Sequence, residues 1–153
     1  MKKNIVLLLV AVTFFISNIS FAQTNSYVDE YKGLAKSLSM EFGIPTSIIL
    51  SIAIVESGAG SSKVAKKLNN HFGIKGKNEV TWSSFKQYTS PEESFRDFCL
   101  KMASKKFYLN MKGNADYALW IKKISMTGYS TQPKQWRSKI NKTIQKNKLD
   151  NEQ

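Results

Sequence analysis

The sequence has few of the residues from which cross-links and metal sites are built. Cys99 is the only cysteine, so the chain cannot form an internal disulfide. Because Cys99 stands among Phe95, Phe98 and Met102, we expect it to be a small core residue and not a catalytic thiol. His71 is the only histidine, and one histidine with one cysteine argues against a dedicated metal site. We therefore expect neither a metal nor a cofactor.

Long apolar segments are limited to one, at the N-terminus. Two lysines precede an almost wholly apolar run over residues 5–16, and the small residues of Ser20-Phe21-Ala22 follow it. This order is typical of a secretory signal peptide, and the run is too short to span a bilayer comfortably as an anchor. We expect a cleaved leader over residues 1–22 and one domain over residues 23–153, periplasmic or secreted, with no membrane span after cleavage.

Acidic residues are scarce relative to basic ones. The chain has 11 Asp and Glu against 23 Lys and Arg, a net charge of +12, and loss of the two leader lysines leaves +10. A strongly basic protein attracts polyanions. For an exported bacterial protein the nearest polyanion is the wall or the envelope surface, so we expect no nucleic-acid partner. Lysines that only keep the domain soluble explain much of the same charge. We expect the domain to be a monomer.

Apolar spacing predicts a mostly α domain with a small β element. Apolar residues recur at helical spacing over residues 27–42, and Gly43 stops the run. Residues 46–57 are apolar nearly all round, so this helix should run through the core. Glycines and β-forming residues over residues 71–89 indicate a loop and a small strand pair. Further helices are expected over residues 62–68 and over residues 115–125. A capping box at Ser90-Pro91-Glu92-Glu93 predicts the start of another helix. A last helix should begin at Pro133 and carry Trp136, Ile140 and Ile144, and we expect the chain to fray after Gln145.

Glu56 is the least expected residue of this pattern, because it is a carboxylate near the end of an apolar helix. Helical register puts it on the same stripe as Ile49, Ile52 and Ala53. Burial penalises the charged carboxylate and raises its pKa, which keeps the proton bound closer to neutral pH. A protonated Glu beside a cleft is the group with which a glycosidase protonates a leaving oxygen. A structural Glu that caps a helix or pairs with a lysine would give the same pattern, so the residues alone leave both interpretations open.

Several separated motifs follow the order of a known enzyme family. The segments Ile44-Pro45-Thr46-Ser47, Glu56-Ser57-Gly58-Ala59-Gly60 and Asn69-Asn70-His71-Phe72-Gly73-Ile74-Lys75-Gly76 resemble the glucosaminidase domain of glycoside hydrolase family 73. In the second half, Tyr88-Thr89-Ser90-Pro91-Glu92-Glu93 resembles that family's capping segment, and Gly128-Tyr129-Ser130-Thr131 resembles its GYAT turn. The resemblance runs from about Tyr27 to Leu149.

This resemblance carries implications for both fold and activity. It implies a lysozyme-like domain, mostly α (α+β), with a small β lobe beside the cleft. The implied activity is that of an endo-β-N-acetylglucosaminidase that hydrolyses the glycan strands of bacterial peptidoglycan. Glu56, as the Glu of the ESG motif, is the implied general acid.

The second catalytic group is left open by the resemblance. Family members often carry a second acidic residue on a longer β lobe, and here Glu79 is the only carboxylate within residues 73–87. Glu79 is either a base that activates water or a turn residue, whereas the capping box explains Glu93 without catalysis. Gln132 stands where the family commonly has Asp. One carboxylate suffices if the substrate's own acetamido group stabilises the developing cation, and Tyr129 would then hold that group. Alternatively, Tyr129 is a core aromatic that fixes the turn.

The floor of the cleft is expected to be lined by Asn70, Phe72, Gly73 and Lys75, with packing as the alternative role, above all for Phe72. Trp136 is more typical of a core residue than of a platform for a sugar ring.

Two other functions fit the same features. A lytic transglycosylase shares the fold class and the single Glu but leaves an anhydro sugar, and a wall-binding module would have lost catalysis. The FGIKG and GYST motifs favour the glucosaminidase.

Overall fold

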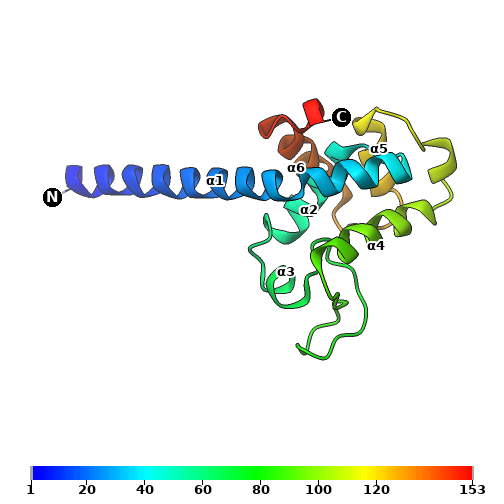
Figure 1. Ribbon diagram of the computed structural model, residues 1–153. Helices are drawn as coiled ribbons and strands as arrows, with labels where there is room; N and C mark the ends of the chain where they lie inside the picture. Colours follow the sequence, from blue (N-terminus) through cyan, green and yellow to red (C-terminus); the bar gives the residue numbers. More distant parts are fainter. Residues whose placement is uncertain (1, 153) are drawn as a thin grey trace.

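The computed structural model describes the backbone of residues 2–152 and the side chains of residues 22–151. Its helices are α1 (Lys2–Phe42), α2 (Thr46–Ser57), α3 (Lys63–Leu68), α4 (Pro91–Ala103), α5 (Tyr117–Ser125) and α6 (Pro133–Lys146), with 3₁₀ turns η1 (Tyr108–Asn110) and η2 (Leu149–Glu152). Figure 1 shows the C-terminal half of α1 lying against the other helices. The predicted signal peptide, residues 1–22, falls almost entirely outside the described side chains. Within the described part of the chain, no helix combines the length and apolar character that crossing a membrane requires.

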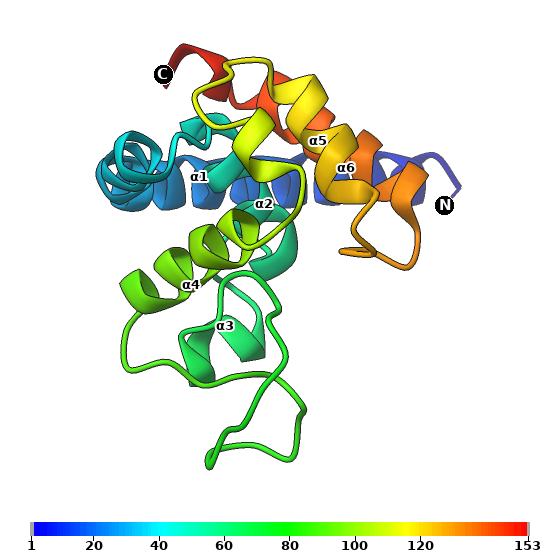
Figure 2. The ribbon, with the colours of Figure 1, turned by 90° about the vertical axis from the view of Figure 1, so that its right-hand side faces the viewer.

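The centre of the domain is α2, whose bounds match the helix predicted over residues 46–57. Every residue from Thr46 to Ile54 is buried, as expected for a helix that is apolar nearly all round. The C-terminal half of α1 packs against α2, and so do α6, α5, α4 and η2 (Figure 2). The helix ends at Gly58, whose left-handed backbone (φ 59°, ψ 49°) lets its N–H bond to the carbonyl of Ile54.

The helix predicted over residues 27–42 is confirmed as the last part of α1, which begins at Lys2. Its apolar stripe, including Tyr27, Tyr31, Leu38 and Phe42, is buried against the core. Gly43 then ends the helix with φ +64°, where a β-carbon would come within 2.7 Å of the backbone nitrogen of Gly113. Both the backbone conformation and the close contact therefore require glycine at this turn.

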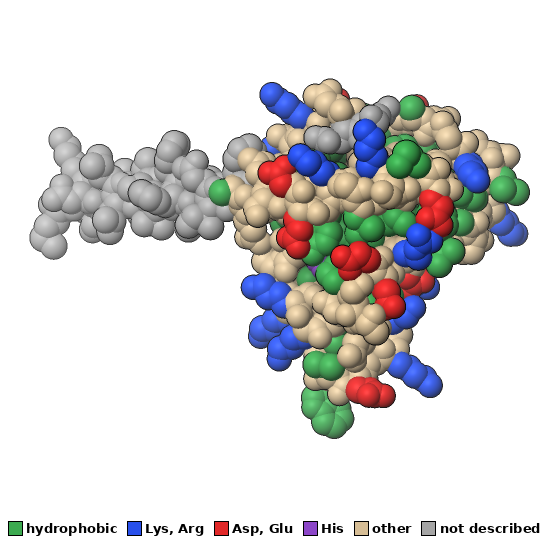
Figure 3. Space-filling model, viewed as in Figure 1, with side chains coloured by type: hydrophobic (Ala, Val, Ile, Leu, Met, Phe, Trp, Pro, Cys, Tyr) green, Lys and Arg blue, Asp and Glu red, His purple; other side chains and the backbone are tan. Residues whose placement is uncertain are grey.

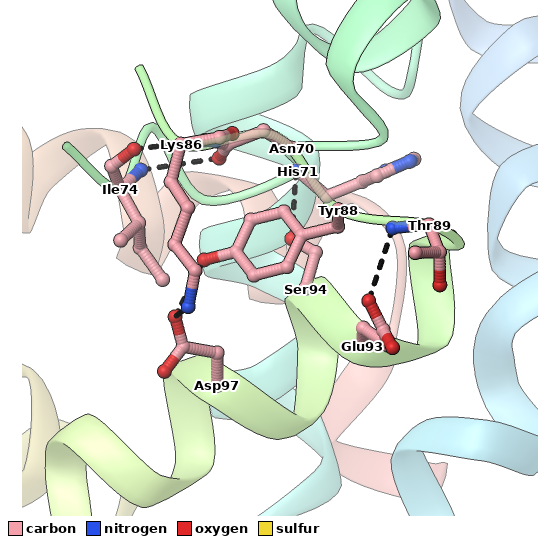
Figure 4. Close-up of polar contacts among 9 residues, drawn as sticks. All are labelled: Asn70, His71, Ile74, Lys86, Tyr88, Thr89, Glu93, Ser94 and Asp97. Atoms are coloured by element: carbon pink, nitrogen blue, oxygen red, sulfur yellow. Dashed lines mark hydrogen bonds and ion pairs between the residues drawn. The ribbon is translucent and has the colours of Figure 1, made fainter. Parts of the chain in front are cut away.

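The small strand pair expected within residues 71–89 is absent from the described structure, and that prediction is wrong. A single antiparallel bridge joins Lys75 to Phe85. Backbone hydrogen bonds join the two arms of the loop from the Lys86 N–H to the Ile74 carbonyl at 2.8 Å and from the Gly76 N–H to the Ser84 carbonyl at 3.0 Å. Side-chain amides add to them, as Figure 4 shows for Asn70, which donates to the carbonyls of Ile74 and Lys86 at 2.8 Å each and accepts from the Ile74 N–H at 3.1 Å. Asn78 ties the tip in the same way, donating to the carbonyls of Ser83 and Phe85 at 2.7 and 2.8 Å. The β lobe is thus a loop, residues 71–89, held by a few backbone hydrogen bonds and by two asparagine side chains.

The start of α4 confirms the predicted capping box. The Ser90 hydroxyl accepts from the Glu93 N–H. Figure 4 shows the second bond, in which the Glu93 carboxylate accepts from the Thr89 N–H at 3.0 Å. Glu93 therefore has a structural role at a helix N-terminus. One turn further on, Asp97 accepts from the Tyr88 hydroxyl and from the Lys86 ammonium, which fastens the end of the 71–89 loop to α4.

The two residues singled out as rare are both packed into the interior. Cys99 is buried in the core, as predicted, and burial raises the pKa of its thiol to about 12. His71 is buried among aromatic rings, and its Nδ1 lies 2.6 Å from the Tyr27 hydroxyl. Its backbone N–H donates to the Ser94 hydroxyl (Figure 4). Histidine thus links α1, the 71–89 loop and α4.

The expected fraying after Gln145 is also wrong. The helix α6 continues to Lys146, and η2 follows it from Leu149. The Leu149 side chain is fully buried and packs in the same core as α2. One apolar residue within a Lys- and Asn-rich tail is enough to hold this end of the chain against the core.

Candidate active site

Glu56 lies in the last turn of α2, where the apolar helix reaches the surface of the core. Its side chain is half-buried, and its Oε1 accepts a hydrogen bond of 2.8 Å from the indole Nε1 of Trp136. Trp136 comes from the first turn of α6, which packs directly against α2. The contact between these two helices therefore fixes one oxygen of the carboxyl group.

The Glu56 carboxyl opens into a cavity of about 410 Å³. Its walls come from the end of α2, from the turn that precedes α6, and from the first two turns of α6. The lining residues are Val55, Glu56, Tyr129, Ser130, Thr131, Gln132, Gln135, Trp136 and Lys139. Among these described residues Glu56 is the only carboxylate, so the cavity presents one acid among neutral polar groups and one lysine.

The surroundings of Glu56 favour its protonated form. Burial raises the pKa of the carboxyl above its ordinary value, while the Trp136 N–H and the charge of Lys139 act in the opposite direction. A carboxyl that keeps its proton closer to neutral pH, beside an open cavity, has the properties of a general acid. The one described hydrogen bond of the Glu56 side chain goes to a side chain of another helix and not to a backbone group at a helix end.

Tyr129 forms part of the cavity wall. Its ring centre lies 5.4 Å from that of Trp136, and its hydroxyl donates to the Phe72 carbonyl at 3.1 Å. Burial holds the pKa of this hydroxyl well above its ordinary value. The side chain thus fixes the turn to the 71–89 loop and also lines the cavity, while its contact with a substrate stays a prediction.

Of the segment from Asn70 to Lys75, which was predicted to line the cleft floor, Gly73 lies beside the Glu56 carboxyl. A β-carbon on Gly73, which has φ +64°, would lie 3.7 Å from Glu56 Oε2 and 3.8 Å from the Phe85 ring. Asn70 and Phe72 are buried and hold the loop from beneath, which is the packing role that was the alternative for both. Lys75 is exposed, with its ammonium 3.5 Å from the centre of the Phe85 ring.

Glu79 is placed differently from Glu56. Its side chain is exposed near the tip of the 71–89 loop, and it is absent from the residues that line the cavity. Its backbone N–H donates to the Gln87 side chain, as befits a turn residue. Within the described side chains, no group of three His, Cys, Asp or Glu residues is arranged to hold a metal ion.

Trp136 and Lys139, the two side chains that lower the pKa of Glu56, were not predicted as site residues. Trp136 was assigned to the core, and it is buried, but its N–H also meets the Glu56 carboxyl. Lys139 was not singled out, although a residue three positions after Trp136 lies on the same face of a helix. Helical spacing from Trp136 would have identified Lys139, whereas nothing in the local sequence links Trp136 to Glu56.

Comparison with known proteins gives a consistent family match. The family model described as mannosyl-glycoprotein endo-beta-N-acetylglucosaminidase matches residues 32–149. The exo-glucosaminidase LytG of Bacillus subtilis (strain 168) is 27% identical over 146 residues, which cover 81% of this chain and 51% of that protein. The chain therefore spans about half the length of this curated relative.

Solved structures show the same fold at low sequence identity. The catalytic domain of the autolysin Auto from Listeria monocytogenes is similar with a TM-score of 0.69 and 20% identity, over 86% of this chain and 88% of that one. A peptidoglycan hydrolase from Sphingomonas sp. A1 gives a TM-score of 0.67 and 23% identity, over 83% and 91% of the two chains. The predicted lysozyme-like, mostly α fold is thereby confirmed.

Proposed function

Since the chain belongs to the mannosyl-glycoprotein endo-beta-N-acetylglucosaminidase family, we propose that it is an exported enzyme that hydrolyses the glycan strands of bacterial peptidoglycan. The observation that carries the proposal is Glu56, a half-buried acid that opens into a cavity at the end of the core helix. Support for the substrate comes from LytG, an exo-glucosaminidase, and from the Sphingomonas protein, a peptidoglycan hydrolase. The apolar leader of residues 5–16 supports export.

In the proposed reaction Glu56 is the general acid. Its Oε2 gives a proton to the glycosidic oxygen while the bond from that oxygen to the sugar C1 breaks, and the bonding electrons leave with the oxygen as a hydroxyl group. The carbonyl oxygen of the substrate's acetamido group bonds to C1 and forms a cyclic oxazolinium ion, whose charge the Glu56 carboxylate balances. Water then attacks C1, displaces the acetamido oxygen and returns one proton to Glu56.

The polar side of the cavity supports this substrate-assisted route. Glu56 is the only carboxylate among the described cavity residues, so a second protein carboxylate is not at hand to act as nucleophile. Tyr129, held by the Phe72 carbonyl, is the proposed wall against which the acetamido group is oriented. Glu79 is assigned no chemical step, because its side chain is exposed on the loop.

The positive charge of the chain supports an anionic wall as partner. Lysine and arginine side chains are dispersed over the face shown in Figure 3, with acidic groups between them. On that face the attraction would come from overall charge and not from one patch. Binding to the wall and cleavage of its strands are therefore separable properties of the protein.

Product analysis tests the proposal. Purified peptidoglycan is digested with the mature protein, and the reduced fragments are analysed by mass spectrometry. We expect fragments that end in reducing N-acetylglucosamine. Anhydro-muramic ends would instead identify a lytic transglycosylase, reducing muramic ends a muramidase, and binding without cleavage a wall-binding module.

A further inference from the structure

The Trp136 indole stands out among the residues around Glu56, because its N–H reaches the reacting carboxyl from inside the core. We infer that Trp136 is a positioning residue, which keeps the acid proton of Glu56 on Oε2 by occupying Oε1. This inference rests on the proposed function of Glu56 as general acid. It adds a specific task to a residue whose burial alone would mark it as packing.

Packing around the Trp136 ring fixes its orientation, so that the indole N–H points at the Glu56 carboxyl. Trp136 is only 5% exposed, and its ring packs beside that of Tyr129 at a centre-to-centre distance of 5.4 Å. Tyr129 is itself tied to the Phe72 carbonyl through its hydroxyl. The backbone N–H of Trp136 bonds to the Gln132 carbonyl at 3.0 Å, which fixes the residue in the first turn of α6. The bond of 2.8 Å to Glu56 Oε1 is therefore preorganised by packing on several sides.

The chemistry of the indole decides which oxygen carries the proton. An indole Nε1 is a donor only, so its partner must offer a lone pair. A protonated carboxyl has one carbonyl oxygen and one hydroxyl oxygen, and a donor on Oε1 favours the form in which Oε2 is the hydroxyl. None of the described residues donates to Oε2. Oε2 instead adjoins Gly73, where the lack of a side chain leaves room for a leaving oxygen to approach.

The same hydrogen bond moderates the acidity of Glu56. It stabilises the carboxylate that remains after the proton has been given away, and so opposes the effect of burial on the pKa. The other groups facing Glu56 are Lys139 on α6, which acts in the same direction, and the Tyr129 hydroxyl, which stays neutral. Loss of the indole N–H should therefore raise the pKa of Glu56 and leave its proton free to occupy either oxygen.

A pair of matched substitutions tests this role. Trp136→Phe removes the N–H and keeps an aromatic ring beside Tyr129. The control is Trp120→Phe on α5, where a fully buried indole donates to the Asn114 carbonyl at 2.8 Å, away from the cavity residues. We expect Trp136→Phe to lower kcat roughly tenfold, less than the 10²–10⁴-fold of a lost general acid, with little change in KM. Its basic pH limb should move to higher pH, whereas Trp120→Phe keeps the wild-type limb.

A structural role would give a different result. If both variants lost activity to a similar degree with unchanged pH limbs, Trp136 would be a packing residue and the inference would be wrong. A wild-type protein without any cleavage would instead contradict the proposed function, independently of Trp136.

A second measurement needs no substitution at Trp136 and no activity. The chain has three tryptophans, so isotope-labelled protein gives three indole N–H signals in nuclear magnetic resonance spectra. We expect the Trp136 signal to shift with pH as Glu56 titrates, and to lose that shift in Glu56→Gln. The signals of Trp82 and Trp120 should stay constant over the same range. A Trp136 signal that does not respond to pH would refute the coupling, even in a protein that cleaves its substrate.

Discussion

Replacement of Glu56 by Gln isolates the proton of the proposed acid from its packing. The Gln carbonyl oxygen can accept the Trp136 N–H in place of Oε1, and the amide NH₂ then takes the position of Oε2 beside Gly73. No volume is lost and no buried donor is left without a partner, so the fold should persist. The amide cannot give a proton to the leaving oxygen. We expect cleavage to fall by at least about 10²–10⁴-fold, the usual contribution of general acid catalysis.

The stability of the same variant gives an independent check, because its sign follows from the pKa. The folded state raises the pKa of Glu56 above its ordinary value of 4.5, so the protonated form is favoured on folding. That favourable contribution is complete below the ordinary pKa and is lost as pH rises through the raised, folded-state pKa. Gln has no such dependence, so the melting temperature of the variant relative to wild type should rise with pH over this window.

The expected size of the stability effect is small. Glu56 is half-buried, so water screens part of the cost of its charge, and a difference of about 1 kcal/mol is the appropriate scale. For a domain of this length that corresponds to a shift of roughly 4 °C in melting temperature.

Two assays and one control measure these effects. Clearing of wall suspensions reports cleavage, thermal melting reports stability, and Glu79→Gln makes the same chemical change on the exposed loop. Glu79→Gln should keep most of its activity, and a loss as deep as that of Glu56→Gln would make Glu79 the second catalytic carboxylate. An active Glu56→Gln protein would refute the mechanism. An inactive one that melts far below wild type would show that Glu56 is needed for the fold.

Three further predictions concern the loop, the C-terminus and the charge. Asn70→Ala removes three hydrogen bonds of the 71–89 loop and should cost about 2–4 kcal/mol of unfolding free energy, seen in urea titration; an unchanged midpoint would contradict the loop's dependence on this side chain. Leu149→Ala should cost about 2–5 kcal/mol in the same assay, whereas a frayed end would give no change. Wall binding should weaken as salt rises, because exposed charges are screened over roughly 8 Å at physiological ionic strength, and salt-independent pull-down would exclude an electrostatic contribution.

The helices could be predicted because their signals are local. The bounds of α2 follow from its apolar run between Pro45 and Gly58, and the start of α4 follows from its capping box. These features act within one or two turns of the chain, where side-chain spacing and capping decide the outcome. The same holds for Gly43, whose positive φ is dictated by the turn that it ends.

The strand pair expected within residues 71–89 was mispredicted because the pairing of the two arms stops at a single bridge. Valine, threonine and aromatic residues there favour strands only if their backbone groups find a neighbouring strand. Here backbone hydrogen bonds join the two arms only around the bridge between Lys75 and Phe85, and Asn70 and Asn78 supply further bonds from their side chains. An asparagine at a turn is common, so the composition of the loop did not reveal that two of them organise it.

The residues of the candidate site also differ in whether the local sequence identifies them. Glu56 was singled out because a carboxylate at the end of an apolar helix conflicts with its own surroundings, and the ESG motif of the resembling family then favoured a catalytic role over a structural one. Trp136 could not be found in this way, because it stands 80 positions away and fits a core position without conflict. Assigning each residue either to the core or to function misses a buried side chain that does both. The ring of Trp136 packs in the core, and its indole N–H donates to the Glu56 carboxyl. In the same way, the ring of Tyr129 packs beside Trp136, and its hydroxyl bonds to the 71–89 loop. The rigidity that the proposed acid requires therefore comes from residues whose sequence pattern predicts only packing.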